Sequence, residues 1–193
     1  PIRGIWLKRS TQLITSRGCP YKCIYCGSNL IFGRKVRRRS VDNVISEIQF
    51  LIKNYNIDGL WFVDDTFTLD KSWVLEFCRQ LKQNNIILKW GCQTRVNVLS
   101  EELLLEMKKS GCVQLDIGVE SGSEKILAVL QKGITPQQIE SAFVLTKKVG
   151  LRTLASFMIG NPEEDMNDIN KSLDLAKKIK ANYTLFFFAT PFP

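Results

Sequence analysis

The chain alternates short apolar runs with longer amphipathic segments, and this alternation restricts the fold more than any other feature of the sequence. The pattern is typical of βαβ units, in which helices join parallel strands and cover the sheet. Six apolar runs have the length of buried strands: Gln12–Ser16, Gly59–Asp64, Leu88–Gln93, Val113–Val119, Thr153–Ile159 and Tyr183–Phe188. The sequence therefore predicts an α/β fold built on six parallel strands.

The segments between these strands carry helix start and end signals. Ser40 precedes a run whose apolar residues recur at the spacing of one helix face. Ser100 opens a helix that we expect to end at Gly111. A helix from Thr135, with proline in its first turn and a capping-box glutamine, is expected to end at Gly150, and Asp165 is expected to cap a last helix.

The length of the chain limits the number of such units. A strand and its helix take roughly 30 residues, and the chain has 193. Because a closed eight-fold barrel typically needs about 250 residues, we predict a partial, more open (βα)6 TIM-like barrel. We expect residues 1–193 to form one domain of a longer protein, since the sixth strand runs almost to Pro193 and only a short lead-in precedes the first strand.

Polar residues gather where the predicted strands end. They are Arg17 to Cys26, Asp64-Asp65, Arg95, Glu120-Ser121 and Gly160-Asn161. Ligand sites of parallel α/β folds lie at the carboxyl ends of the strands. In the fourth strand, the alternation of side chains places Asp116, Gly118 and Glu120 on one face, which we expect to line the barrel interior.

Three of the six cysteines stand in one loop, with C-x3-C-x2-C spacing at Cys19, Cys23 and Cys26. One short loop can wrap three thiolates around a single small inorganic group. Structural zinc usually takes four ligands, and the chain has no histidine and no fourth cysteine nearby. A [4Fe–4S] cluster with three protein thiolates keeps one iron open for another ligand. The spacing favours such a cluster and leaves zinc, or a plain thiol trio, as alternatives.

Composition excludes some classes and leaves others open. The chain carries a formal charge of +8, much of it in the run Arg34 to Arg39, which fits either a solvated loop or a patch that contacts RNA. No apolar run approaches the ~18 residues that a membrane-spanning helix needs, and no signal peptide is recognisable. The remaining cysteines, Cys78, Cys92 and Cys112, lie in apolar segments and are expected to be buried thiols. We therefore expect a soluble cytoplasmic domain.

Several motifs together resemble the core of the radical S-adenosylmethionine (SAM) superfamily, and most closely its cobalamin-binding-type branch. They are the cysteine loop with its preceding Thr15 to Pro20, Asp64-Asp65-Thr66-Phe67, Gly118 to Ser123, Gly160 to Glu164 and Ala189 to Pro193. One position departs from the family pattern, which often has glycine where this chain has Glu163.

The resemblance implies a [4Fe–4S] cluster on the three cysteines and SAM as second cofactor. It implies that Asp64 and Asp65 receive the amino group of SAM, that Glu120 bonds the ribose, and that Lys132 or Arg95 pairs with the carboxylate. Tyr25 and the strand end at Gly160 would flank adenine, and Ser121 is a further cofactor-binding candidate; no catalytic residue beyond the cluster is implied. The residues alone also allow simpler roles: a strand-end turn or cap for the two aspartates, an ion pair between Glu120 and Arg95, and a helix-end cation at Lys132.

The implied activity is reductive cleavage of SAM to a 5′-deoxyadenosyl radical, for cobalamin-dependent methylation or a related rearrangement or cyclisation. The implied partners are a flavodoxin- or ferredoxin-like reductant and a small-molecule substrate, with cobalamin held by a domain upstream of this chain and a further region downstream. Two alternatives remain at this point. One is a methylthiotransferase acting on tRNA or a ribosomal protein, and the other is a zinc-stabilised nucleic-acid-binding domain.

Overall fold

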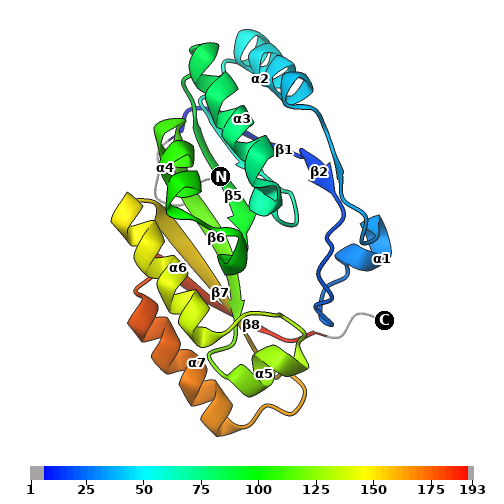
Figure 1. The fold of residues 1–193 in the computed structure, drawn as a ribbon, viewed down its shortest axis with the longest axis vertical. Coiled ribbons are helices and arrows are strands. Elements are labelled where there is room, and N and C mark those ends of the chain that lie inside the picture. The colour runs from blue at the N-terminus through cyan, green and yellow to red at the C-terminus, as the bar shows by residue number, and fades with distance from the viewer. Residues whose placement is uncertain (1–6, 191–193) are drawn as a thin grey trace.

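The computed structural model describes residues 7–190, and a six-stranded sheet lies at its centre (Figure 1). In sheet order the strands are β1 (Ser10–Leu13), β4 (Gly59–Phe62), β5 (Lys89–Thr94), β6 (Cys112–Glu120), β7 (Arg152–Ile159) and β8 (Tyr183–Phe188). Every neighbouring pair is parallel. Spatial order equals chain order, as in an open (βα)6 barrel, so the predicted fold class is confirmed.

Five helices form the outer layer and contact one another in chain order (Figure 1). They are α2 (Val41–Tyr55), α3 (Lys71–Gln83), α4 (Glu101–Lys109), α6 (Pro136–Val149) and α7 (Met166–Ile179). Two short helices, α1 (Ser28–Phe32) and α5 (Glu124–Val129), and two 3-10 turns, Phe67–Leu69 and Val96–Val98, complete the described chain. No helix in residues 7–190 is long and apolar enough to cross a membrane.

The predicted helix caps are confirmed. Ser40, Ser100, Thr135 and Asp165 each accept a hydrogen bond from a backbone N–H in the first turn, and the last two form full capping boxes. The helix at 101–109 ends two residues before Gly111, whose φ of 101° suits only glycine, since an added Cβ would lie 2.3 Å from the Leu88 carbonyl oxygen.

The first strand differs most from its predicted bounds, and helices α1, α3 and α5 were not predicted. The first strand ends at Leu13 rather than Ser16 because the Asp64 carboxylate accepts a hydrogen bond from Thr15 N–H at 3.0 Å, so this backbone group leaves the sheet. The chain then forms the ribbon of β2 (Ser16–Arg17) and β3 (Arg37–Arg38). Helix α3 was not predicted, although its buried residues Val74, Phe77, Cys78 and Leu81 follow helical spacing.

The core fills the space between sheet and outer helices. Phe62, Phe67, Phe77 and Trp90 form an aromatic cluster with ring centroids 4.6–5.9 Å apart. The Trp90 indole N–H donates to the Ser110 carbonyl oxygen at 3.0 Å, so its polar atom is satisfied. Burial of such side chains contributes about 1.5–3 kcal/mol each to folding. Leu115, Ile117 and Val119 of β6 also face this core, which leaves the opposite face of β6 for the site.

Candidate functional site

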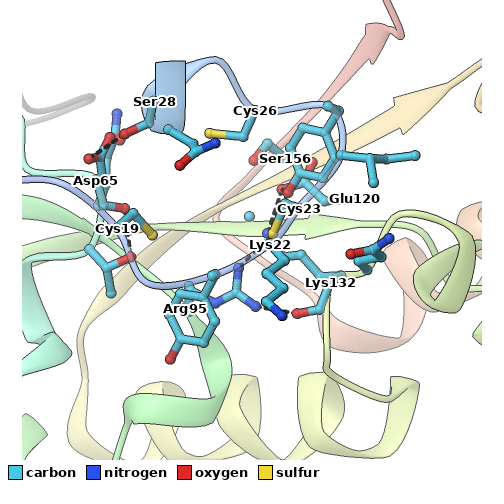
Figure 2. A pocket seen from close by; sticks show the side chains of 18 of the residues that line it. Cys19, Lys22, Cys23, Cys26, Ser28, Asp65, Arg95, Glu120, Lys132 and Ser156 are labelled. Carbon is cyan, nitrogen blue, oxygen red and sulfur yellow. Dashed lines mark hydrogen bonds and ion pairs between the residues drawn. The ribbon is translucent and has the colours of Figure 1, made fainter. Parts of the chain in front are cut away.

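A cleft of about 860 Å³ lies over the inner face of the sheet, and the cysteine loop forms one of its walls (Figure 2). Cys19, Cys23 and Cys26 line it together with Asp65 and residues from the ends of β5, β6 and β7. As the alternation in β6 predicts, Asp116, Gly118 and Glu120 also line the cleft. The loop that carries the thiols thus faces the carboxyl ends of the parallel strands.

Backbone contacts hold the cysteine loop in place. Gly18 begins it with a φ of 94°, and an added Cβ would lie 2.4 Å from the Lys35 carbonyl oxygen. Cys19 N–H donates to the Gly33 carbonyl oxygen at 3.3 Å, and Ile24 N–H donates to the Leu130 carbonyl oxygen at 3.2 Å. The loop is therefore fastened both to the segment after α1 and to the segment after α5.

The three thiols face one cleft without forming a tight group. Cys19 and Cys23 are half-buried and Cys26 is exposed. Within residues 7–190, no three cysteine, aspartate, glutamate or histidine side chains lie close enough together to hold a single metal ion. Burial raises the pKa of Cys26, a hydrogen bond from the Ser28 backbone opposes this rise, and the nearby Asp65 carboxylate adds to it. Three thiols in one loop match the three-thiolate ligand set of a [4Fe–4S] cluster, whereas structural zinc usually takes four ligands.

Arg95 places a positive charge beside the thiols. One guanidinium nitrogen donates to Cys23 Sγ at 3.3 Å, and another donates to the Lys132 carbonyl oxygen. The guanidinium carbon also lies 3.7 Å from the ring centroid of Tyr21, a cation–π contact that fixes its plane. The predicted ion pair between Arg95 and Glu120 is not formed, because Arg95 is engaged by the cysteine loop.

Glu120 pairs with Lys132 instead. Lys132 Nζ lies 2.8 Å from Glu120 Oε1 and 2.9 Å from the Tyr25 hydroxyl, which donates to the same carboxylate at 3.0 Å. Both charged residues are buried, so Lys132 is not the solvated helix-end cation that the sequence allows. Burial, followed by the charge of Glu120, raises the pKa of Tyr25 far above its usual range, so the hydroxyl stays protonated.

The two neighbouring aspartates have different roles. Asp64 is fully buried and accepts hydrogen bonds from the Thr15 N–H and the hydroxyls of Thr15 and Ser16. Asp65 points into the cleft and accepts a hydrogen bond from the Ser28 hydroxyl at 2.6 Å. Of the predicted pair, the structure brings only Asp65 to the cleft, while Asp64 fixes the chain that enters the cysteine loop.

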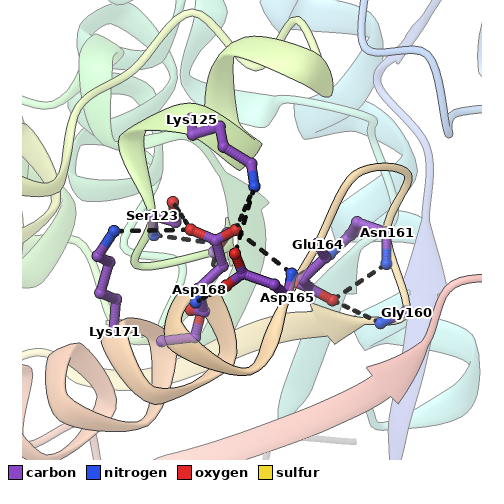
Figure 3. Close-up of polar contacts among 10 residues, drawn as sticks. Ser123, Lys125, Gly160, Asn161, Glu164, Asp165, Asp168 and Lys171 are labelled. Atoms are coloured by element: carbon purple, nitrogen blue, oxygen red, sulfur yellow. Dashed lines mark hydrogen bonds and ion pairs between the residues drawn. The ribbon is translucent and has the colours of Figure 1, made fainter.

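Ser121 and Gly160 lie outside the cleft, in the loops after β6 and β7. Figure 3 shows Gly160 in its loop. The Ser121 and Ser172 hydroxyls lie 3.1 Å apart, and Gly122 N–H donates to the Ser172 hydroxyl at 2.8 Å. Gly160 N–H donates to the Glu164 carboxylate at 2.6 Å. Both residues therefore shape the loops that carry the site.

The sequence prediction missed several residues on the cleft wall. Gln93 and Ser156 line it from β5 and β7, and Tyr21 lines it from the cysteine loop. Strand alternation could have identified Ser156, because Leu154 and Ser156 share the inner face of β7. Cys78, Cys92 and Cys112 are buried as predicted, and burial raises the pKa of Cys78 to about 11. Of the motif at residues 189–193, positions 191–193 lie outside the described residues.

The basic run divides into a packed part and an exposed part. Arg39 donates to the Ile14 carbonyl oxygen at 3.0 Å and pairs with Glu47. Arg38 is half-buried, with its guanidinium carbon 4.7 Å from the Trp73 ring centroid. Arg34, Lys35 and Arg37 stay exposed, so the interpretation as a wholly solvated loop holds for part of the run only.

Comparison with known proteins agrees with this geometry. The sequence model of the radical SAM superfamily matches residues 13–176, a range that contains the cysteine loop and every strand from β4 to β7. The chain belongs to the radical SAM superfamily. Because this superfamily consists of enzymes, the prediction of an enzyme is confirmed.

Individual relatives include methyltransferases, cyclases and a putative methylthiotransferase of Methanocaldococcus jannaschii. An uncharacterized methyltransferase of Pyrococcus horikoshii is 41% identical over 94% of this chain and 39% of its own length. The anaerobic magnesium-protoporphyrin IX monomethyl ester cyclase of Rubrivivax gelatinosus is 29% identical over 92% of this chain and 32% of its own length. The chain thus spans about a third to two-fifths of these relatives.

A solved structure shares the fold. The radical SAM methyltransferase TsrM of Kitasatospora setae, with cobalamin and a [4Fe–4S] cluster bound, superimposes with a TM-score of 0.82. The match covers 92% of this chain and 34% of TsrM at 20% sequence identity. It confirms the partial barrel of this chain, and its bound groups are properties of TsrM.

Proposed function

We propose that this chain binds a [4Fe–4S] cluster through Cys19, Cys23 and Cys26 and cleaves SAM reductively in the adjoining cleft. The observation that carries the proposal is the position of the three thiols: all belong to one loop and line one cleft at the carboxyl ends of the parallel strands. Three thiolates leave one iron for SAM. When bound, the cluster supplies the electron that splits SAM into methionine and a 5′-deoxyadenosyl radical.

The cleft residues fit the groups of SAM. Asp65 offers a carboxylate to the amino group, and Arg95 offers a guanidinium to the carboxylate. Glu120 has one carboxylate oxygen engaged by Lys132 and Tyr25, so the other is available to the ribose hydroxyls. Lys132 pairs with Glu120 and orients its carboxylate, and the backbone of Tyr25, in the cysteine loop, would contact adenine.

Asp64, Ser121 and Gly160 would act indirectly. Asp64 anchors Thr15 and Ser16, three to four residues before Cys19. Ser121 and Gly160 fix the turns after β6 and β7. Their side chains or backbones hold the strand ends that present Glu120 and Ser156 to the cleft.

We infer the reaction of the whole protein from the reactions named for its relatives. Because methyltransferases and cyclases occur among them, we propose that the radical serves methylation or a related cyclisation of a small molecule. Cobalamin is bound in the longer TsrM chain, and here it would be held by a part of the protein beyond residues 1–193. A flavodoxin- or ferredoxin-like protein would supply the electron, and the enzyme would act in the cytoplasm.

Product analysis of SAM cleavage tests the proposal. Full-length protein, reconstituted with iron and sulfide and reduced with dithionite, should convert SAM to methionine and 5′-deoxyadenosine. Glu120→Gln should keep the cluster spectrum and weaken SAM binding by about ten-fold, the effect of losing a hydrogen bond to a charged group. A protein that holds the cluster and yields no 5′-deoxyadenosine under these conditions would refute reductive cleavage.

A further inference from the structure

The positive charge of the chain is concentrated at one end of the sequence. Residues 1–40 contain ten lysine and arginine residues and no aspartate or glutamate, whereas the remaining residues contain 17 cationic and 19 anionic side chains. The net charge of +8 therefore comes from the segment that contains the cysteine loop. Such a one-sided distribution attracts anionic partners to one face.

Five of these cations form an exposed group, which we call the basic rim: Arg17, Lys22, Arg34, Lys35 and Arg37. Across residues 7–190, no acidic side chain forms an ion pair with any of them. This distinguishes the rim from the lysines of the outer helices, many of which are paired with a neighbouring carboxylate.

The basic rim lies directly against the cysteine loop. Arg17 and Arg37 are register partners in the β2–β3 ribbon, which leads into the loop. The Arg34 guanidinium donates to the Tyr21 carbonyl oxygen at 3.1 Å, and the Lys35 carbonyl oxygen lies against Gly18. Lys22 is part of the loop itself. Figure 1 shows this ribbon and α1 on the side of the molecule away from α6 and α7.

An exposed apolar surface adjoins the rim. Helix α1 buries none of its residues, and Leu30 and Ile31 are 78% and 75% exposed. Cys26, an exposed thiol, precedes this helix by two residues. Transient complexes commonly join a small apolar centre to a charged rim, which raises the association rate more than the affinity.

We propose that the basic rim and α1 form the docking surface for an acidic electron-transfer protein that reduces the cluster. This inference rests on the proposed function, because only a cluster on the cysteine loop gives the electron a destination here. One electron passes from the reduced donor to the cluster; the donor is oxidised by one electron and no bond to the chain forms. Complexes of this kind bury little surface and rely on electrostatic steering.

The side chains favour an acidic protein over nucleic acid as the occupant. Single-stranded nucleic acids bind where exposed aromatic rings stack on bases. On α1 the exposed apolar side chains, Leu30 and Ile31, are aliphatic, while Phe32, Tyr21 and Tyr25 are half-buried. The exposed aromatic residue of the cleft, Phe187, belongs to β8 and not to the rim. Exposed aliphatic side chains can pack against apolar side chains of a partner protein, whereas a phosphate backbone offers them no apolar contact.

Stopped-flow reduction of the reconstituted full-length protein by a bacterial flavodoxin hydroquinone tests this proposal. The double variant Lys35→Glu/Arg37→Glu leaves the cleft residues unchanged and should lower the second-order rate constant at low ionic strength by roughly ten-fold or more. Added salt should slow the wild-type reaction and have little effect on the variant. Ile31→Gln should lower the rate constant by about two- to five-fold without changing its salt dependence, because it removes apolar contact area only.

The matched control is Lys147→Glu/Lys177→Glu, which makes the same change of net charge on α6 and α7. Its rate constant should stay within about two-fold of the wild-type value, because salt screens the effect of an exposed charge beyond about 10 Å. Reduction by dithionite should be equal for all variants, with equal 5′-deoxyadenosine formation. An equal decrease of the rate constant in both double variants would overturn the proposed docking surface. Tight binding of an RNA oligonucleotide to the rim, in competition with flavodoxin, would overturn it as well. Failure of the wild type with dithionite would instead overturn the proposed function.

Discussion

At the scale of single residues, Arg95 connects more parts of the site than any other side chain described above. It donates to Cys23 Sγ, to the Lys132 carbonyl oxygen, and stacks on Tyr21. Sequence alone identified Arg95 as a candidate for the carboxylate of SAM, or else for an ion pair with Glu120, and did not predict its contact with the cysteine loop. The choice of partner depends on the fold of the cysteine loop, which no local pattern specifies.

The contact with Cys23 predicts a tuned reduction potential. Hydrogen bonds and positive charge at a cluster sulfur stabilise the reduced, more negative state and raise the potential. Arg95→Met should therefore lower the potential of the bound cluster by roughly 50–100 mV, equivalent to about 1–2 kcal/mol for one electron. A redox titration followed by electron paramagnetic resonance measures the shift, and an unchanged potential would show that the contact has no such effect.

Glu163 is the position where this chain departs from the family pattern, which often has glycine there. It is exposed and adopts a φ of 62°, a left-handed conformation that costs an L-residue about 1–2 kcal/mol and glycine almost nothing. The turn after β7 thus keeps its geometry at the expense of strain. Predicting this from sequence required knowing the backbone angle, which the family resemblance suggests only indirectly.

Glu163→Gly should therefore stabilise the protein. The gain from the relieved strain exceeds the roughly 0.5–1 kcal/mol that glycine loses through a more flexible unfolded chain, so we expect a net increase of about 0.5 kcal/mol in the free energy of unfolding. Denaturant unfolding measures it. The same replacement at Glu140, inside α6, should destabilise the protein by about 1 kcal/mol. If Glu163→Gly does not stabilise the protein, the account of the turn is contradicted.

At the scale of elements, α7 supports the end of β6 from outside the cleft (Figure 3). The buried Asp168 carboxylate accepts from the Ser123 hydroxyl at 2.6 Å and pairs with Lys125 at 2.7 Å, while Ser172 engages Ser121 and Gly122. These contacts fix the turn after Glu120, itself at a φ of 68°. The cap at Asp165 was predictable from sequence; the bridge between two loops was not, because it joins residues 45 positions apart.

The contacts of Asp168 with Ser123 and Lys125 predict a folding stability that depends on pH. The hydrogen bond with Lys125, then that with Ser123, holds the pKa of Asp168 well below its usual range. A carboxyl with a depressed folded pKa stabilises the native state above its unfolded pKa of about 3.9, and the stabilisation is lost as pH falls below that value. Asp168→Asn should lower the free energy of unfolding most at neutral pH and progressively less below about pH 4.

Urea unfolding of both proteins across pH 3–7 checks this prediction. Asp174, an exposed residue of the same helix, provides the control, since Asp174→Asn should change stability little at any pH. A constant difference between wild type and Asp168→Asn over the whole range would mean that the carboxylate charge contributes nothing to the bridge.

At the scale of the whole molecule, the strand–helix alternation was enough to predict six parallel strands and the edge of the sheet where the site lies. Strand β8 matches its predicted bounds, and the remaining strands differ by a few residues. The β2–β3 ribbon could not be predicted, because it depends on Asp64 capturing the backbone of Thr15. The same long-range contact separates Asp64 from Asp65 in function.

The central claim is that Cys19, Cys23 and Cys26 together hold one cluster with an open iron. Electron paramagnetic resonance of the reconstituted, dithionite-reduced full-length protein, recorded with and without SAM, tests it most directly. We predict a [4Fe–4S]+ signal that SAM perturbs, loss of that signal in Cys23→Ala, and its retention in Cys78→Ala, whose thiol is buried in α3. An unaltered cluster signal in Cys23→Ala, or a wild-type signal that SAM leaves unchanged, would contradict the account.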